Sequence, residues 1–217
     1  MRTIPFRRIF AQARDHARWT SPARAIAALV TLLQASPALA SPPPLSFTPI
    51  APRFSEAADQ YRALWDQEGN RIVEALERNA GLGFPDSPIE VLVTDSATMT
   101  AFDGRTIRIR AGYSIAFAKA TFAHEMGHRL AQALPRTAEM DDHRVLYLFL
   151  YDAWTDLYGR EFADRMVAIE RRIGPAYEAA WDWALAMTRE QRQARLAALR
   201  AQSTASQTAA SSSPKLR

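Results

Sequence analysis

The chain has 217 residues, of which 27 are basic, 23 are acidic and none is cysteine. The absence of cysteine excludes disulfides, thiolate metal ligands and lipid attachment to a cysteine. The net charge of +4 comes from the first 40 residues, which hold six arginines and one aspartate, so that 21 basic and 22 acidic residues remain. The composition therefore gives no indication of nucleic-acid binding.

Residues 1–40 have the order of a secretory signal. An arginine-rich start precedes the apolar run AIAALVTLLQ, and the small-residue site ALA follows at 38–40. The run is too short for a stable membrane span once the signal is removed. We expect cleavage near Ala40 and a periplasmic or secreted protein. We expect export by the general secretory route in preference to the twin-arginine route, because the arginine pair Arg7-Arg8 lies well before the apolar run. An amphipathic surface helix is the alternative.

The rest of the chain is long enough for one domain with its own core. Its composition predicts a proline-rich linker over 41–53, the domain over 54–202, and a polar, disordered tail over 203–217.

Within the domain, the period of the apolar residues changes twice. It is helical over 54–80, and a short β-branched run then predicts a strand over 89–93. Asp103-Gly104, inside 98–110, is typical of a hairpin turn between two strands. Helical periodicity returns from residue 113 onward. The sequence predicts an α+β fold, in which a small twisted antiparallel or mixed sheet with a hairpin packs on a helix and a mainly helical C-terminal half follows.

The helix predicted over 113–134 carries FAHEMGHRLA, with His124, Glu125 and His128 in the pattern H-E-x-x-H. Residues four apart share one face of a helix, so both imidazoles can bind one ion with the glutamate beside them. A zinc ion there acidifies water, and the glutamate can remove its proton. The pattern predicts a hydrolytic zinc site, and a pair of surface histidines is the alternative.

HEMGH, after a strand and hairpin and before another helix, resembles the active-site helix of the zincin metallopeptidases. The resemblance covers roughly residues 85–160. It implies one Zn²⁺ per chain, a peptide or protein substrate held along the edge strand of the sheet, and Glu125 as general base. In the glutamate-ligand branch, a following helix supplies the third ligand, and an acid four residues later orients a ligand histidine.

In LYDAWTDLYG this comparison places Asp152 at the ligand position and Asp156 at the orienting position, although the branch uses glutamate as ligand. TDLYG is weakly similar to the motif of the aspartate-ligand zincins, which would make Asp156 the ligand. Both aspartates share a face with apolar residues, where an isolated carboxylate is costly unless it is paired or metal-bound. Pairing with arginines such as Arg144 or Arg160 is the alternative.

His143 is the remaining histidine of the domain and another candidate ligand, because three histidines can hold a catalytic zinc. It lies nine residues before Asp152, about 180° around a helix, so the two do not easily face the same ion. A surface position at the start of a helix is the alternative. Tyr147, Tyr151 and Tyr158 are candidates for stabilising an oxyanion, and an ordinary packed tyrosine is the alternative for each.

These patterns predict an exported zinc peptidase with His124, His128 and Asp152 as metal ligands, water in the remaining position, Glu125 as base and Asp156 behind a ligand histidine. Three other functions fit the same sequence. They are a zinc-binding interaction or assembly protein of zincin fold without catalysis, a helical interaction protein without metal, and metal-assisted hydrolysis of another bond.

Overall fold

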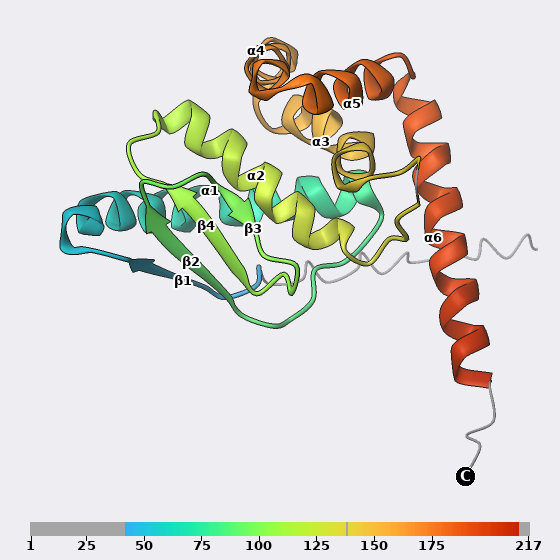
Figure 1. Cartoon of the computed structure of the whole chain (residues 1–217), viewed down its shortest axis with the longest axis horizontal. Helices are drawn as coiled ribbons and strands as arrows, with labels where there is room; N and C mark the ends of the chain where they lie inside the picture. The colour runs from blue at the N-terminus through green and yellow to red at the C-terminus, as the bar shows by residue number, and fades with distance from the viewer. Residues whose placement is uncertain (1–41, 138, 213–217) are drawn as a thin grey trace, which may run out of the picture. The chain divides into compact units, whose positions relative to one another are not determined.

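A computed structural model describes residues 42–137 and 139–212. The predicted signal over 1–40 and its cleavage near Ala40 lie outside these residues. The described part confirms the predicted α+β class, with a mixed sheet first and a mainly helical half after it (Figure 1).

The sheet has four strands in the order β1-β2-β4-β3. β2 runs parallel to both β1 and β4, whereas β3 is antiparallel to β4 and lies at the edge. The β3–β4 pair is the predicted hairpin, and Gly104 in its turn has a φ of 65°. The strand bounds are β1 Leu45–Pro49, β2 Ile89–Thr94, β3 Met99–Thr100 and β4 Thr106–Arg110.

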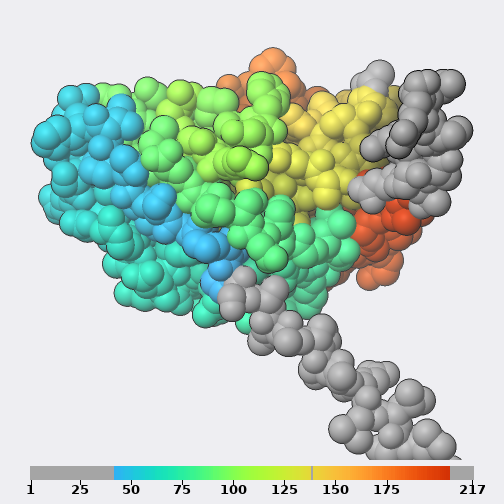
Figure 2. Space-filling model, turned by 90° about the horizontal axis from the view of Figure 1, so that it is seen from below, coloured from blue at the N-terminus to red at the C-terminus, as the bar shows by residue number. Residues whose placement is uncertain are grey.

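Strand β1 lies inside the segment that we expected to be a linker. Its register places Phe47 beside Val91, and Val91 beside Ile107, and all three side chains are buried. Because neighbouring residues of a strand point to opposite faces, Glu90 lies on the other, exposed face. In Figure 2 the blue atoms of the first described residues run along the surface beside the green atoms of later strands. The alternation of apolar and polar residues in LSFTP is thus that of a half-buried strand.

Six α-helices and two short 3-10 helices complete the described fold. α1 is unbroken through Gly69 and Asn70, and it ends at Gly81, whose φ is 64°. α6 continues to Ser212, so the helix includes the first ten residues of the predicted tail. The bounds are η1 Pro52–Phe54, α1 Ser55–Ala80, α2 Ile115–Ala131, α3 Asp142–Tyr158, α4 Arg160–Glu170, η2 Arg171–Ile173, α5 Pro175–Leu185 and α6 Arg189–Ser212.

Helix α2 is fixed between the sheet and the other helices. The ring of Phe122 contacts those of Phe47 and Tyr61, with centroids 5.9 and 5.7 Å apart. On the side of α3, a β-carbon at Gly127 would come within 2.5 Å of Leu146. This close approach of a side chain of α3 accounts for a glycine in the middle of a helix.

None of the described helices is both long and apolar enough to cross a membrane.

Candidate metal centre

The predicted pair of histidines on α2 converges in space. Ser114 caps the helix, because its hydroxyl accepts a hydrogen bond from the backbone N–H of Phe117. Ten and fourteen residues later, the Nε2 atoms of His124 and His128 lie 3.0 Å apart. The helical spacing predicted this convergence, and the structure confirms it.

His143 joins this pair from the first turn of α3. The side chain of Asp141 caps that helix and accepts from the backbone N–H of Arg144 at 2.8 Å. The capped start of α3 lies beside α2, and the ring centroids of His143 and His128 are 5.0 Å apart. One nitrogen from each of His124, His128 and His143 lies within 4.8 Å of the other two. Among the described residues, these three histidines form the group able to hold a metal ion.

The protonation of the three rings favours metal binding at two of them. Burial, followed by the positive charge of His124, lowers the pKa of His143 to about 4 and that of His128 well below its usual value. Both rings are therefore neutral near pH 7 and present a lone pair. Burial opposes the charged form of His124 as well, but the carboxylate of Glu170 outweighs it and raises the pKa of His124.

The donor set fits a zinc ion. Zinc binds imidazole nitrogen at ~2.0–2.1 Å in a tetrahedral arrangement, which separates two ligand nitrogens by about 3.4 Å. The 3.0 Å between His124 and His128 is close to this value. Three protein ligands also leave a coordination position for a reactant, whereas structural zinc sites are closed by four.

Glu170, at the end of α4, holds His124 from the side opposite the other histidines. Its Oε1 lies 2.7 Å from Nδ1 of His124, while its Oε2 accepts hydrogen bonds of 2.9 Å from Tyr147 and Trp181. The carboxylate is buried, but these donors and the charge of His124 outweigh the burial and lower the pKa of Glu170. An Nδ1–H that donates to Glu170 leaves Nε2 of His124 free to bind a metal.

We expect Glu170→Gln to weaken zinc binding by ~10–100-fold, because loss of a carboxylate behind a ligand histidine typically has this effect. Zinc competition with a chelator of known affinity measures the change. Glu161→Gln on the same helix is the matched control, because Glu161 is exposed and forms an ion pair with Arg165. An unchanged zinc affinity in Glu170→Gln would remove Glu170 from the site.

Glu125 faces the same cleft and is held by the edge strand. The Thr100 hydroxyl lies 2.6 Å from Oε2 of Glu125 and 3.0 Å from its backbone carbonyl. Burial, which outweighs the neighbouring charge of His124 and this hydrogen bond, raises the pKa of Glu125. A carboxylate whose pKa lies closer to neutrality is a more effective general base.

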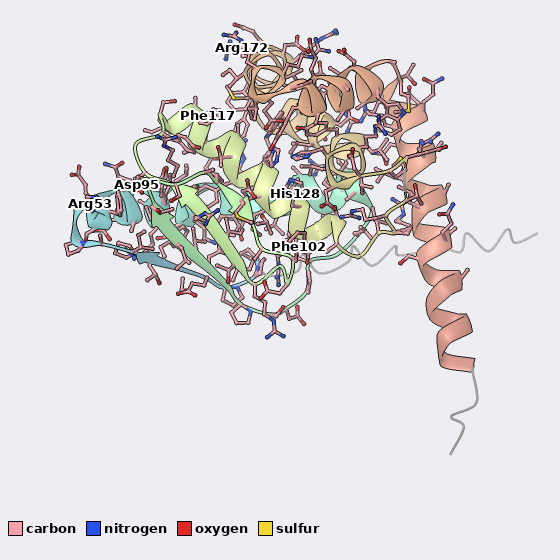
Figure 3. All side chains as sticks on the ribbon, viewed as in Figure 1. Arg53, Asp95, Phe102, Phe117, His128 and Arg172 are labelled. Atoms are coloured by element: carbon pink, nitrogen blue, oxygen red, sulfur yellow. The ribbon has the colours of Figure 1, made fainter. Side chains whose placement is uncertain are left out.

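The cleft has a volume of about 600 Å³ and opens between the hairpin, α2 and the start of α3. His128 on α2 and Phe102 in the hairpin loop are labelled in Figure 3. The lining residues are 98–102, His124, Glu125, His128, Gln132, Leu134, Arg136, 141–143 and Tyr177.

The structure places Asp152 outside this three-histidine group. Its Oδ1 and Oδ2 accept hydrogen bonds from Arg192 of α6, at 2.6 Å from Nη2 and 3.1 Å from Nε. Both side chains are about 5% exposed or less. A separation of nine positions puts His143 and Asp152 on opposite sides of α3, and the His143 side is the one that contributes to the three-histidine group.

Asp156 is likewise paired with arginine and not placed behind a ligand histidine. Arg189 donates to both of its oxygens, at 3.0 and 2.9 Å, and Asn79 donates at 2.9 Å. The hydrogen bonds from Arg189 lower the pKa of Asp156, although partial burial opposes this shift. The alternative of arginine pairing therefore describes both aspartates. The arginines come from α6 and, for Asp156, also from Arg78 of α1, and not from positions 144 and 160.

None of the three tyrosines considered from the sequence lines the cleft. Tyr147 donates to Glu170, and Tyr151 donates to Asp164 at 2.7 Å. The buried hydroxyl of Tyr158 has no hydrogen-bond partner in the described structure. The tyrosine that lines the cleft is Tyr177, which the sequence did not single out.

Glu170 was also missed, although the sequence carries a signal for it. It continues the apolar series of Phe162, Met166 and Glu170 at intervals of four, and all three are buried. A carboxylate in an apolar series needs a partner, and here that partner is a candidate metal ligand. No comparable signal marks Tyr177 or Thr100.

The fold and the site together define an α+β protein with a buried three-histidine cluster that can hold a metal ion. Comparisons of the chain with models of known protein families, with curated proteins and with solved structures gave no match.

Proposed function

We propose that this protein is a zinc-dependent peptidase with His124, His128 and His143 as its metal ligands. The observation that carries the proposal is the convergence of these three histidines beside the carboxylate of Glu125 in one cleft. A purely structural metal site has no use for a carboxylate that lines the cleft without being a ligand. Three ligands also leave room for a reactant.

The chain offers a surface for an extended peptide. β3 is an edge strand of the described sheet, and residues 98–102 line the cleft. The unpaired edge of a strand can hydrogen-bond an added peptide strand through its backbone groups. This arrangement supports a peptide substrate in preference to another hydrolysable bond.

Glu125 performs the proton transfers in this scheme. Its carboxylate takes a proton from the attacking water and then delivers it to the leaving amine nitrogen. Thr100 of β3 donates a hydrogen bond to this carboxylate. The same strand therefore positions the general base and binds the substrate. Zinc on the three imidazoles supplies a Lewis acid, which polarises the scissile carbonyl and makes water more acidic.

Zinc analysis and digestion of a peptide library, with wild type and Glu125→Gln in parallel, test this function. Glutamine has nearly the size of glutamate and Glu125 is not a ligand, so the variant should keep one zinc per chain. Its turnover should fall by ~10²–10⁴-fold because the general base is gone. Glu178→Gln is the matched control, since Glu178 is exposed on α5 and does not line the cleft.

Unchanged turnover in Glu125→Gln would remove Glu125 from the mechanism. A zinc-loaded wild type that cleaves no peptide would favour a metal-binding protein without peptidase activity. A protein that retains no zinc after purification and reconstitution would contradict the metal site itself.

A further inference from the structure

Tyr177 is the tyrosine beside the three-histidine cluster. It lies in the first turn of α5, which begins at Pro175, and its half-buried side chain lines the cleft with Glu125. Its ring packs on that of His143, with centroids 4.2 Å apart and planes inclined by 48°. The same contact fixes the ring of a candidate ligand and the position of a phenol next to it.

The Tyr177 hydroxyl differs from those of two nearby tyrosines, Tyr147 and Tyr113, which do not line the cleft. Within the described structure it donates to no protein atom, whereas Tyr147 donates to Glu170 and Tyr113 shares a hydrogen bond with Thr98. A phenol that lines a cleft and is held by its ring, but has no protein acceptor, is available to a bound molecule.

We propose that Tyr177 donates the hydrogen bond that stabilises the oxyanion formed during peptide hydrolysis. This inference rests on the proposed peptidase function and adds a catalytic residue to it. A donor that is already in place when charge develops stabilises the transition state more than the substrate. The packing of the Tyr177 ring on His143 supplies that fixed position.

The reaction balances without a further reactant. Water oxygen bonds to the carbonyl carbon while Glu125 takes a water proton, and the carbonyl π electrons move to the oxygen. The Tyr177 O–H donates to this oxyanion and keeps its proton. The carbonyl then re-forms, and the carbon–nitrogen bond breaks with its electron pair going to nitrogen, which receives the proton from Glu125. Water and one amide bond give one carboxylic acid and one amine.

Tyr177→Phe tests the assignment, because it removes the hydroxyl and keeps the ring that packs on His143. The substrate is the library peptide that wild type cleaves fastest. We expect kcat to fall about 100-fold or more, as for other oxyanion donors, with KM and zinc content nearly unchanged. A phosphinic analogue of the same peptide, in which a tetrahedral phosphinate replaces the scissile amide, should lose affinity in parallel, because it presents its charge at the oxyanion position.

Tyr151→Phe is the matched control, since the Tyr151 hydroxyl donates to Asp164 outside the cleft. An unchanged kcat in Tyr177→Phe, a rise in KM alone, or a loss of zinc would each overturn the assignment while the peptidase function stands. A zinc-loaded wild type without hydrolysis would overturn both. A fall in kcat and in phosphinate affinity with zinc retained supports the assignment.

Discussion

A His143→Ala protein is expected to lose most of its zinc under conditions in which wild type keeps one ion per chain. Zinc sites with four ligands bind with ~10–16 kcal/mol, so one ligand contributes about 3 kcal/mol, or roughly 100-fold in affinity. His143 contributes one of the three nitrogens within 4.8 Å of one another, and only two would remain.

Elemental analysis after dialysis against a zinc buffer held at about ten times the wild-type dissociation constant measures this loss, because wild type is then nearly saturated and a variant weakened ~100-fold is nearly empty. The melting temperature gives a second measure, because zinc that binds only the folded state stabilises it. Added zinc should therefore raise the melting temperature of wild type more than that of His143→Ala. Full zinc occupancy in His143→Ala would show that the third ligand is another residue.

An Asp152→Ala protein is expected to show the reverse pattern, with zinc retained and the fold strongly destabilised. Asp152 and Arg192 form a buried ion pair with two hydrogen bonds, and the alanine variant leaves the Arg192 guanidinium without its carboxylate. Breaking a buried pair in this way typically costs about 3–5 kcal/mol of unfolding free energy. For a protein of this size, the melting temperature should fall by about 6–20 °C.

The double variant Asp152→Leu with Arg192→Met separates the ion pair from a metal ligand. Replacing both charges by apolar side chains of similar size is often close to neutral, so much of the lost stability should return. At saturating metal, the wild type, Asp152→Ala and the double variant should each hold one zinc ion per chain. A metal-free Asp152→Ala protein with an unchanged melting temperature would instead identify Asp152 as a ligand.

The sequence by itself determined the local geometry of the site. The four-residue spacing of His124 and His128 places their rings on one helical face wherever the helix lies, and Glu125 follows from the same pattern. The hairpin also depended on local signals, because Asp103-Gly104 favours a tight turn. β1 was missed because prolines on both sides of LSFTP suggested a linker, whereas pairing with β2 makes this segment part of the sheet.

The tertiary structure alone decided which residue completes the three-histidine group. From the sequence, His143 and Asp152 were competing candidates on opposite sides of one helix, and no local pattern says which side of α3 meets α2. The close contact between Gly127 and Leu146 fixes that packing and leaves Asp152 facing Arg192. A carboxylate on an apolar face needs a partner, but the sequence does not say whether that partner is a metal ion or an arginine 40 residues away.

Glu170 and Tyr177 depend on the tertiary structure for the same physical reason. Glu170 lies 46 residues after His124, and its role follows from the tertiary packing that brings the end of α4 to the ring of His124. Tyr177 is an ordinary aromatic residue until α5 places its ring on His143. Helical spacing sets contacts within one turn or two, so the sequence determined the two histidines and the glutamate of α2. The packing of separate helices decided their third partner and the residues that support them.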